Sequence, residues 1–164
     1  MDYEFSKKQP FHSVEGWYSL EYPRLWEMEV IENIPAFFNP FGGYGSLQVF
    51  AVKMGALANS GNLIENHPFL KGESLTEKMQ LFLERQDQFI PKDSLQLTEK
   101  RHKEGDSTYI VATEYRIENR FYMACMMQRS NIFLLSLYNC EGLPDKAEAR
   151  AVGEILKSIE IHKQ

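Results

Sequence analysis

The sequence predicts an α+β fold: a single-domain antiparallel β-sheet with two amphipathic helices packed on it. Three observations favour this class. Apolar and polar residues alternate, as they do in half-buried strands, over several segments in both halves of the chain. Two other segments carry apolar stripes at helical spacing behind capping residues. The later strands are separated by connections short enough for hairpins, which favours antiparallel pairing.

The chain has 164 residues, of which 18 are Lys or Arg and 23 are Asp or Glu, so its net charge is −5. This length, the even spread of charge and the lack of a linker or repeat predict one domain over residues 1–164. The aromatic content of 13% is too high for a disordered chain. The acidic balance argues against nucleic acid as a partner, because such binding depends on Lys and Arg.

No apolar run approaches the roughly 20 residues that a membrane helix needs, and the first residues lack the pattern of a signal peptide. We therefore expect no membrane insertion. The two cysteines, Cys125 and Cys140, are too few for a disulfide framework. Together these features predict a cytoplasmic protein.

The first strands are expected at 18–22, which Pro23 ends, and at 26–30. In the second of these, Glu27 and Glu29 alternate with apolar residues and are expected on a solvated face.

A third short strand is expected at 34–39, followed by a glycine-rich turn that reaches residue 45. The next strand, 46–54, is apolar on both faces, which is typical of a central strand covered on both sides. A long connection, 55–72, then carries five large apolar residues without periodicity, which argues against simple disorder.

A helix is expected to begin after Ser74, which forms a capping box with Glu77, and to end before Pro91. One face of this helix is expected to hold Leu75, Met79, Phe82, Leu83, Gln86 and Phe89.

A polar edge strand is expected at 94–103, followed by an antiparallel meander over 106–116, 120–129 and 132–139. Counting outward from the turn at residues 130–131 places Cys125 opposite Ser136 and Cys140 opposite Phe121, which argues against a disulfide. A second helix should begin after Asp145, with Glu148 three residues on and a stripe formed by Val152, Ile155, Leu156 and Ile159.

An aromatic strand that leads into Tyr22-Pro23-Arg24-Leu25-Trp26 is followed by the turn Asn39-Pro40-Phe41-Gly42-Gly43 and a further strand. This order over residues 16–52 resembles the PsbP-like superfamily. In that superfamily an aromatic strand, a Tyr-Pro pair and a nearby Trp precede an Asp/Asn-Pro turn, a glycine and a strand. The later order of helix, antiparallel strands and final helix is also similar.

The superfamily includes the extrinsic photosystem PsbP subunit, a Ran-GTPase-binding nuclear-import accessory protein and bacterial families of unknown function. The chain resembles a bacterial member of unknown function. Known members mostly bind other proteins and are not enzymes, so the resemblance implies a non-enzymatic protein. Effector chaperones of bacterial type VI secretion look similar in fold and are acidic and cytoplasmic, but no residue diagnostic of them is matched here.

The residues themselves indicate no catalytic residue, metal or cofactor. Gly42-Gly43-Tyr44-Gly45 lies between two strands and lacks the helix that follows a phosphate-binding loop. The histidines lack ligand spacing, and the local group Glu65-Asn66-His67 is too small for a metal site. Cys125 sits in an apolar strand-like run, where a thiol is inert.

Apolar residues in turns and loops, outside every periodic face, are the candidate partner-binding residues. They are Phe41, Tyr44, Leu57, Leu63, Ile64, Phe69 and Leu70. The loop that holds most of them could equally pack on itself.

The leading hypothesis is a non-enzymatic protein-binding or adaptor domain, chaperone-like in its action, with its acidic charge favouring basic partners. The alternative is a small-ligand-binding or enzymatic domain with a pocket between sheet and helix. A homodimer that serves as a structural module is a third alternative.

Overall fold

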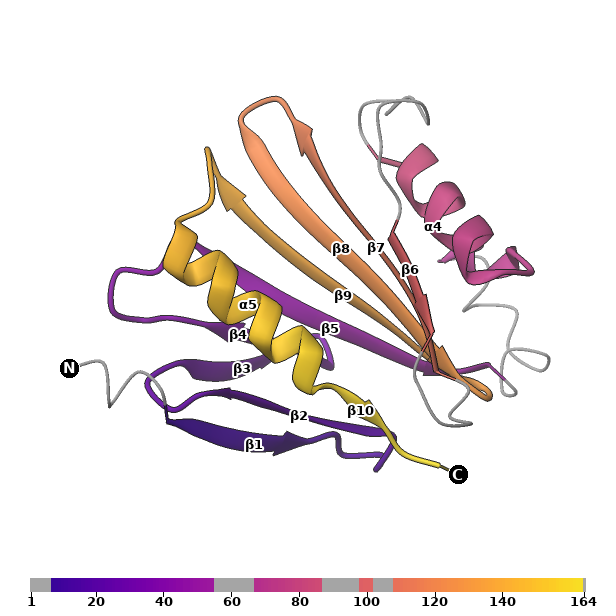
Figure 1. The fold of residues 1–164 in the computed structure, drawn as a ribbon, viewed down its shortest axis with the longest axis horizontal. Coiled ribbons are helices and arrows are strands. Elements are labelled where there is room, and N and C mark those ends of the chain that lie inside the picture. The colour runs from indigo at the N-terminus through magenta and orange to yellow at the C-terminus, as the bar shows by residue number, and fades with distance from the viewer. Residues whose placement is uncertain (1–6, 55–66, 87–97, 102–107, 164) are drawn as a thin grey trace.

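The computed structural model describes residues 7–54, 67–86, 98–101 and 108–163. Within these residues the strands form two antiparallel sheets (Figure 1). The larger sheet has seven strands in the order β3-β4-β5-β9-β8-β7-β6, and the smaller has three in the order β1-β2-β10. The α+β class predicted from the sequence is confirmed, but the strands divide between two sheets where one was predicted.

The strands of the larger sheet are β3 (Glu27–Ile31), β4 (Ile34–Phe38), β5 (Gly45–Lys53), β6 (Thr98–Arg101), β7 (Thr108–Ile117), β8 (Arg120–Arg129) and β9 (Ile132–Glu141). Those of the smaller sheet are β1 (Lys8–His12), β2 (Tyr18–Pro23) and β10 (Glu160–Ile161). The helices are the 3-10 helix η1 (Pro68–Lys71), α4 (Leu75–Glu84) and α5 (Lys146–Ser158). None of the helices in the described ranges combines the length and the apolar character needed to cross a bilayer.

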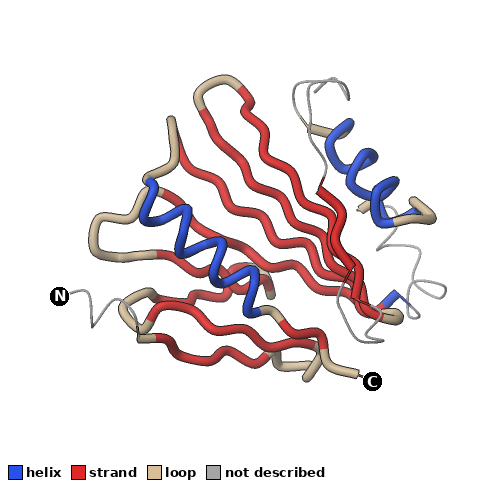
Figure 2. Tube along the Cα trace, viewed as in Figure 1, coloured by secondary structure: helices blue, strands red, loops and turns tan. Residues whose placement is uncertain are grey.

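Each face of the larger sheet carries a separate apolar core. Along β9, Ile132, Leu134 and Tyr138 point into the first core, while Phe133 and Leu135 point into the second. The first core is closed by α5 and the smaller sheet, and the second by α4 and η1. Figure 2 shows α5 running along one side of the strands and α4 lying beyond β7 and β6. The central position of β5, covered on both faces, is therefore confirmed.

The meander has the predicted register: Cys125 lies opposite Ser136, and Cys140 opposite Phe121. Both cysteines are buried and form no disulfide. Of the polar strand predicted at 94–103, residues 98–101 form β6, which is the last strand of the larger sheet within the described ranges, and the rest lie outside the described residues.

Both helices begin where their caps predict. The Ser74 hydroxyl accepts a hydrogen bond from the backbone N–H of Glu77 (3.0 Å), and the Glu77 carboxylate accepts one from the N–H of Glu73 (3.1 Å). The Asp145 carboxylate accepts a hydrogen bond from the N–H of Glu148 (3.0 Å). Helix α4 ends at Glu84, before the expected end. Phe89, expected on the same face, lies outside the described residues.

The expectation for residues 26–30 is wrong in one respect. Trp26 is buried but lies in the turn before β3, and all five residues of β3 are exposed, including the apolar Met28 and Val30. The reason is position: β3 is the outermost strand, and the first core stops at Phe37 on the neighbouring strand β4. Alternation of residue types therefore identified a strand here without indicating that either face is covered.

Candidate functional site

The turn between β4 and β5 presents two aromatic side chains to solvent. Phe41 is 73% exposed and Tyr44 is 62% exposed. The turn is closed by Asn39, whose carbonyl oxygen accepts a hydrogen bond from the N–H of Gly43 (3.0 Å) and whose Oδ1 accepts one from the N–H of Phe41 (2.9 Å). Gly42 has a φ of 85°, a conformation that residues with a Cβ rarely adopt.

Glu148, in the first turn of α5, holds the far end of this turn. Its side chain is only 5% exposed, and its Oε1 accepts a hydrogen bond from the N–H of Tyr44 (2.9 Å). Its Oε2 accepts one from the N–H of Gly45 (2.9 Å) and another from the hydroxyl of Tyr138. A buried carboxylate needs such partners to offset its desolvation. The result is a turn fixed to both the helix and the sheet.

Local structure explains why the carboxylate is placed there. Asp145 starts the helix, so Glu148 lies at the N-terminal end of α5, where the helix dipole stabilises negative charge. Burial, and then the hydrogen bond to Glu148, raise the pKa of Tyr138. The phenol therefore remains a hydrogen-bond donor across the physiological range.

A groove of about 650 Å³ lies beside the turn. Its walls are the exposed side of α5, the turn residues Asn39, Gly42 and Tyr44, and the adjacent parts of β1 and β2. Trp26 lines it together with Arg150. The Nζ of Lys8 and a carboxylate oxygen of Glu154 form an ion pair across 2.7 Å on its border. The groove thus combines aromatic side chains with side chains of both charges.

The structure separates the predicted contact residues. Phe41 and Tyr44 share the exposed turn, whereas Phe69 and Leu70 are buried in the second core beneath α4. These two residues therefore belong to the core and not to an exposed contact surface. Leu57, Leu63 and Ile64 lie outside the described residues.

Sequence reasoning recognised Glu148 as part of a helix start and missed its contact with the turn. The signal available was a Glu three residues after an N-cap Asp. Nothing local indicates that the same carboxylate reaches backbone groups at residues 44 and 45, because only the pairing of β5 with β9 brings them near α5.

Groups suited to catalysis are sparse in the described ranges, where no cluster of three or more His, Cys, Asp or Glu side chains is arranged to hold a metal ion. The ring of His67 packs 4.7 Å from that of Phe50, and burial lowers its pKa. Of the local group predicted with it, Glu65 and Asn66 lie outside the described residues. The buried hydroxyls of Tyr115 and Ser136 have no hydrogen-bond partner within the described part of the chain.

No protein-family model and no curated protein matches the chain. Its fold is similar to that of the cyanobacterial PsbP of Synechocystis sp. PCC 6803, with a TM-score of 0.63, 11% identity, and coverage of 96% of this chain and 94% of that one. It is also similar to a protein of Bacteroides thetaiotaomicron, with a TM-score of 0.54, 19% identity and coverage of 95% of this chain. The chain spans about half, 49%, of the Bacteroides protein. These likenesses confirm the predicted PsbP-like fold.

Proposed function

We propose that the chain is a non-enzymatic protein-binding or adaptor domain whose contact surface is the aromatic turn, residues 39–44, together with the groove beside it. One observation carries the proposal: Phe41 and Tyr44 are exposed on a turn that the buried Glu148 holds in place. Large apolar side chains on a solvated turn add little to the stability of the core and lower the solubility of the protein. Binding to a partner would account for their position.

Fixing the turn favours binding. Aromatic side chains contribute strongly to protein interfaces, and a surface that is ordered before binding loses less conformational entropy when the partner docks. The hydrogen bonds from the N–H groups of Tyr44 and Gly45 to Glu148 supply that order. The groove adds a concave surface next to the two aromatic rings, and the net charge of −5 favours a basic partner.

The proposal also treats residues 1–164 as one domain. Support comes from the smaller sheet, in which β2 lies between β1, from the start of the chain, and β10, from its end. The two thiols that form no disulfide support a cytoplasmic location.

The test is quantitative affinity purification from a lysate of the source organism, with the wild-type chain and two variants as bait. We expect the double variant Phe41→Ser/Tyr44→Ser to lose at least one partner tenfold or more. The variant Val14→Ser removes an apolar side chain that is 99% exposed on the β1–β2 turn, and it should retain that partner. A set of captured proteins that is the same for all three baits would refute the proposal, provided that circular dichroism shows all three folded.

A second candidate function rests on the volume of the groove, which lies in the range typical of small-molecule sites. Under this alternative, Arg150 and Lys8 would contact an anionic group of a ligand. A thermal-shift screen with small anions tests it: a ligand that raises the melting temperature of the wild type but not of Arg150→Ala would support this function.

A further inference from the structure

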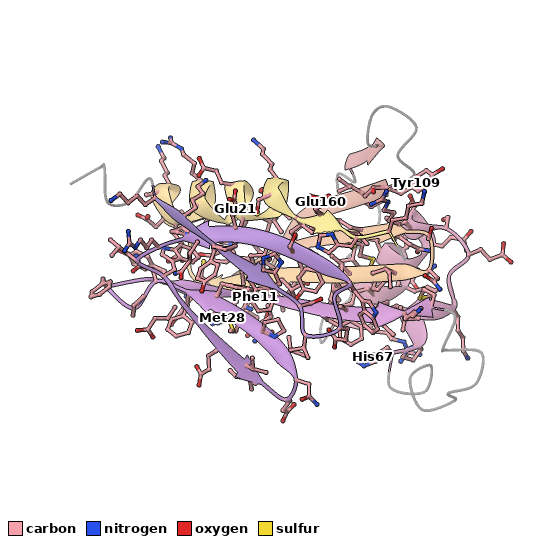
Figure 3. The ribbon with its side chains drawn as sticks, turned by 90° about the horizontal axis from the view of Figure 1, so that it is seen from below. Phe11, Glu21, Met28, His67, Tyr109 and Glu160 are labelled. Carbon is pink, nitrogen blue, oxygen red and sulfur yellow. The ribbon has the colours of Figure 1, made fainter. Side chains whose placement is uncertain are left out.

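The larger sheet ends in an open strand. Within the described ranges β3 pairs only with β4, and all five of its residues are exposed. Met28 is 36% exposed and Val30 is 57% exposed. Figure 3, in which Met28 is labelled, shows the β3–β4 hairpin on the side of the molecule away from α5. Proteins usually cover or interrupt such an edge, because its backbone groups can pair with another chain.

The turn that follows β3 determines which backbone groups are open. Glu32 and Asn33 have φ angles of 52° and 69°, and they join Ile31 to its partner Ile34. A two-residue turn of this kind places its flanking residues in a hydrogen-bonded pair. Because such pairs alternate along an antiparallel ladder, the N–H and C=O groups of Met28 and Val30 point away from β4.

The two faces of β3 differ in chemistry. Met28 lies opposite Phe37, so its side chain continues the apolar face of the first core past the last covered strand. Glu27 and Glu29 alternate with it and place carboxylates on the other face, which they share with the exposed Ile31 next to the turn.

We propose that β3 is a docking site for an extended segment of a partner protein, which adds antiparallel to the edge of the sheet. The segment alternates apolar side chains, which cover Met28 and Val30, with Lys or Arg side chains, which face Glu27 and Glu29. The backbone of the segment forms hydrogen bonds with the outward N–H and C=O groups of Met28 and Val30. This mode of binding is known as strand addition.

Charge favours such a partner over a second copy of this chain. The symmetric antiparallel pairing that overlaps all five residues of β3 is centred on Glu29, and it places two Glu29 carboxylates opposite each other. Like charges directly opposite each other destabilise a pair of strands. A strand with basic residues at those positions reverses the sign of this interaction.

The site is separate from the aromatic turn, so the two proposals can fail independently. The variant Val30→Pro removes strand addition and leaves Phe41 and Tyr44 unchanged. A partner whose capture depends on Phe41 and Tyr44 but not on Val30 binds the aromatic turn, whereas a partner lost only with Val30→Pro supports the docking site at β3.

The probe is a fluorescein-labelled heptapeptide of alternating lysine and valine, and its binding is measured by fluorescence anisotropy. We expect it to bind at least tenfold more tightly than the matched peptide of alternating glutamate and valine. Val30→Pro should weaken the binding tenfold or more, because it removes an outward N–H without breaking a bond to β4. Val30→Thr keeps that N–H and should bind within twofold of the wild type.

A variation of the peptide leaves the protein unchanged and covers the case in which Val30→Pro does not fold. Methylating the backbone nitrogens of the valines, which lie opposite Met28 and Val30, should abolish binding, whereas methylating those of the lysines should not. Equal binding of the two methylated peptides, or of the lysine and glutamate peptides, would overturn the proposal. So would a dimer in light scattering that Val30→Pro converts to a monomer, because a second copy would then occupy the edge.

Discussion

The hydroxyl of Tyr138, in β9, donates a hydrogen bond to the carboxylate of Glu148, in the first turn of α5. The same carboxylate accepts hydrogen bonds from the N–H groups of Tyr44 and of Gly45, the first residue of β5. One buried group therefore connects the sheet, the helix and the turn that carries the exposed aromatic residues.

Replacing Glu148 with Gln should lower the free energy of unfolding by about 2 kcal/mol or more. The amide keeps one acceptor oxygen but places an NH₂ group against donors that previously faced the second oxygen. Urea unfolding measures the loss, and hydrogen exchange of the Tyr44 and Gly45 amides should become faster. The control Tyr138→Phe keeps both backbone bonds and should cost only about 1 kcal/mol. Equal costs for the two variants would contradict the central role of the carboxylate.

Gly45 and Gly153 should respond to alanine in opposite directions. A Cβ on Gly45 would overlap the carbonyl oxygen of Asn139 and lie 2.8 Å from the Cβ of Cys140, so Gly45→Ala should destabilise by about 1–3 kcal/mol. A Cβ on Gly153, within α5, meets no atom within 4 Å, so Gly153→Ala should stabilise by about 0.5–1 kcal/mol. Thermal unfolding of both variants tests the two predictions. A Gly45→Ala variant as stable as the wild type would show that Asn139 and Cys140 leave room for a Cβ at residue 45.

Removing the hydroxyl of Tyr115 should stabilise the protein. This group is buried and has no partner in the described part of the chain, while the ring stacks on Tyr122 with centroids 4.9 Å apart. Tyr115→Phe keeps the stacking and should raise the free energy of unfolding by about 1 kcal/mol. Tyr122→Phe, on the partly exposed ring of the pair, is the control and should change it little. A loss of stability in Tyr115→Phe would indicate that the hydroxyl has a partner.

Alkaline pH should unfold the protein through its buried tyrosines. Burial raises the pKa of Tyr18, Tyr115 and Tyr138 above the value of about 10 expected in the unfolded chain. The folded state therefore holds these protons more tightly. The contribution of these tyrosines to the free energy of unfolding is therefore complete below pH 10. It falls as the pH rises above 10, by up to about 1.4 kcal/mol per pH unit for each tyrosine. Urea unfolding from pH 8 to 11 measures the slope, and a constant free energy above pH 10 would contradict it.

Local signals account for what the sequence could predict. The register of β8 and β9 follows from a short turn, because every pair is counted outward from it. The helix starts at Ser74 and Asp145 follow from side chains within three residues of each cap. The exposure of Phe41 and Tyr44 agrees with their position outside any periodic face.

The remaining features depend on contacts between distant segments. Strands β1 and β10 pair with β2. No apolar alternation marks them, because β1 carries one large apolar residue, Phe11, and β10 has only two residues. The exposure of β3 depends on where the neighbouring sheet ends. The contact of Glu148 with the turn requires α5 and β5 to meet, and no spacing within either segment indicates that they do.

The pairing of β10 with β2 has a consequence for synthesis of the chain. Glu160 lies opposite Ser19, so the smaller sheet cannot be completed until residue 160 has left the ribosome. At typical elongation rates of about 5–20 residues per second, β2 must wait about 7–28 s for this neighbour. During that interval its apolar face, which includes Tyr18 and Leu20, has neither α5 nor β10 to cover it. Until α5 and β10 have formed, this face of the nascent protein is therefore available to ribosome-associated holding factors.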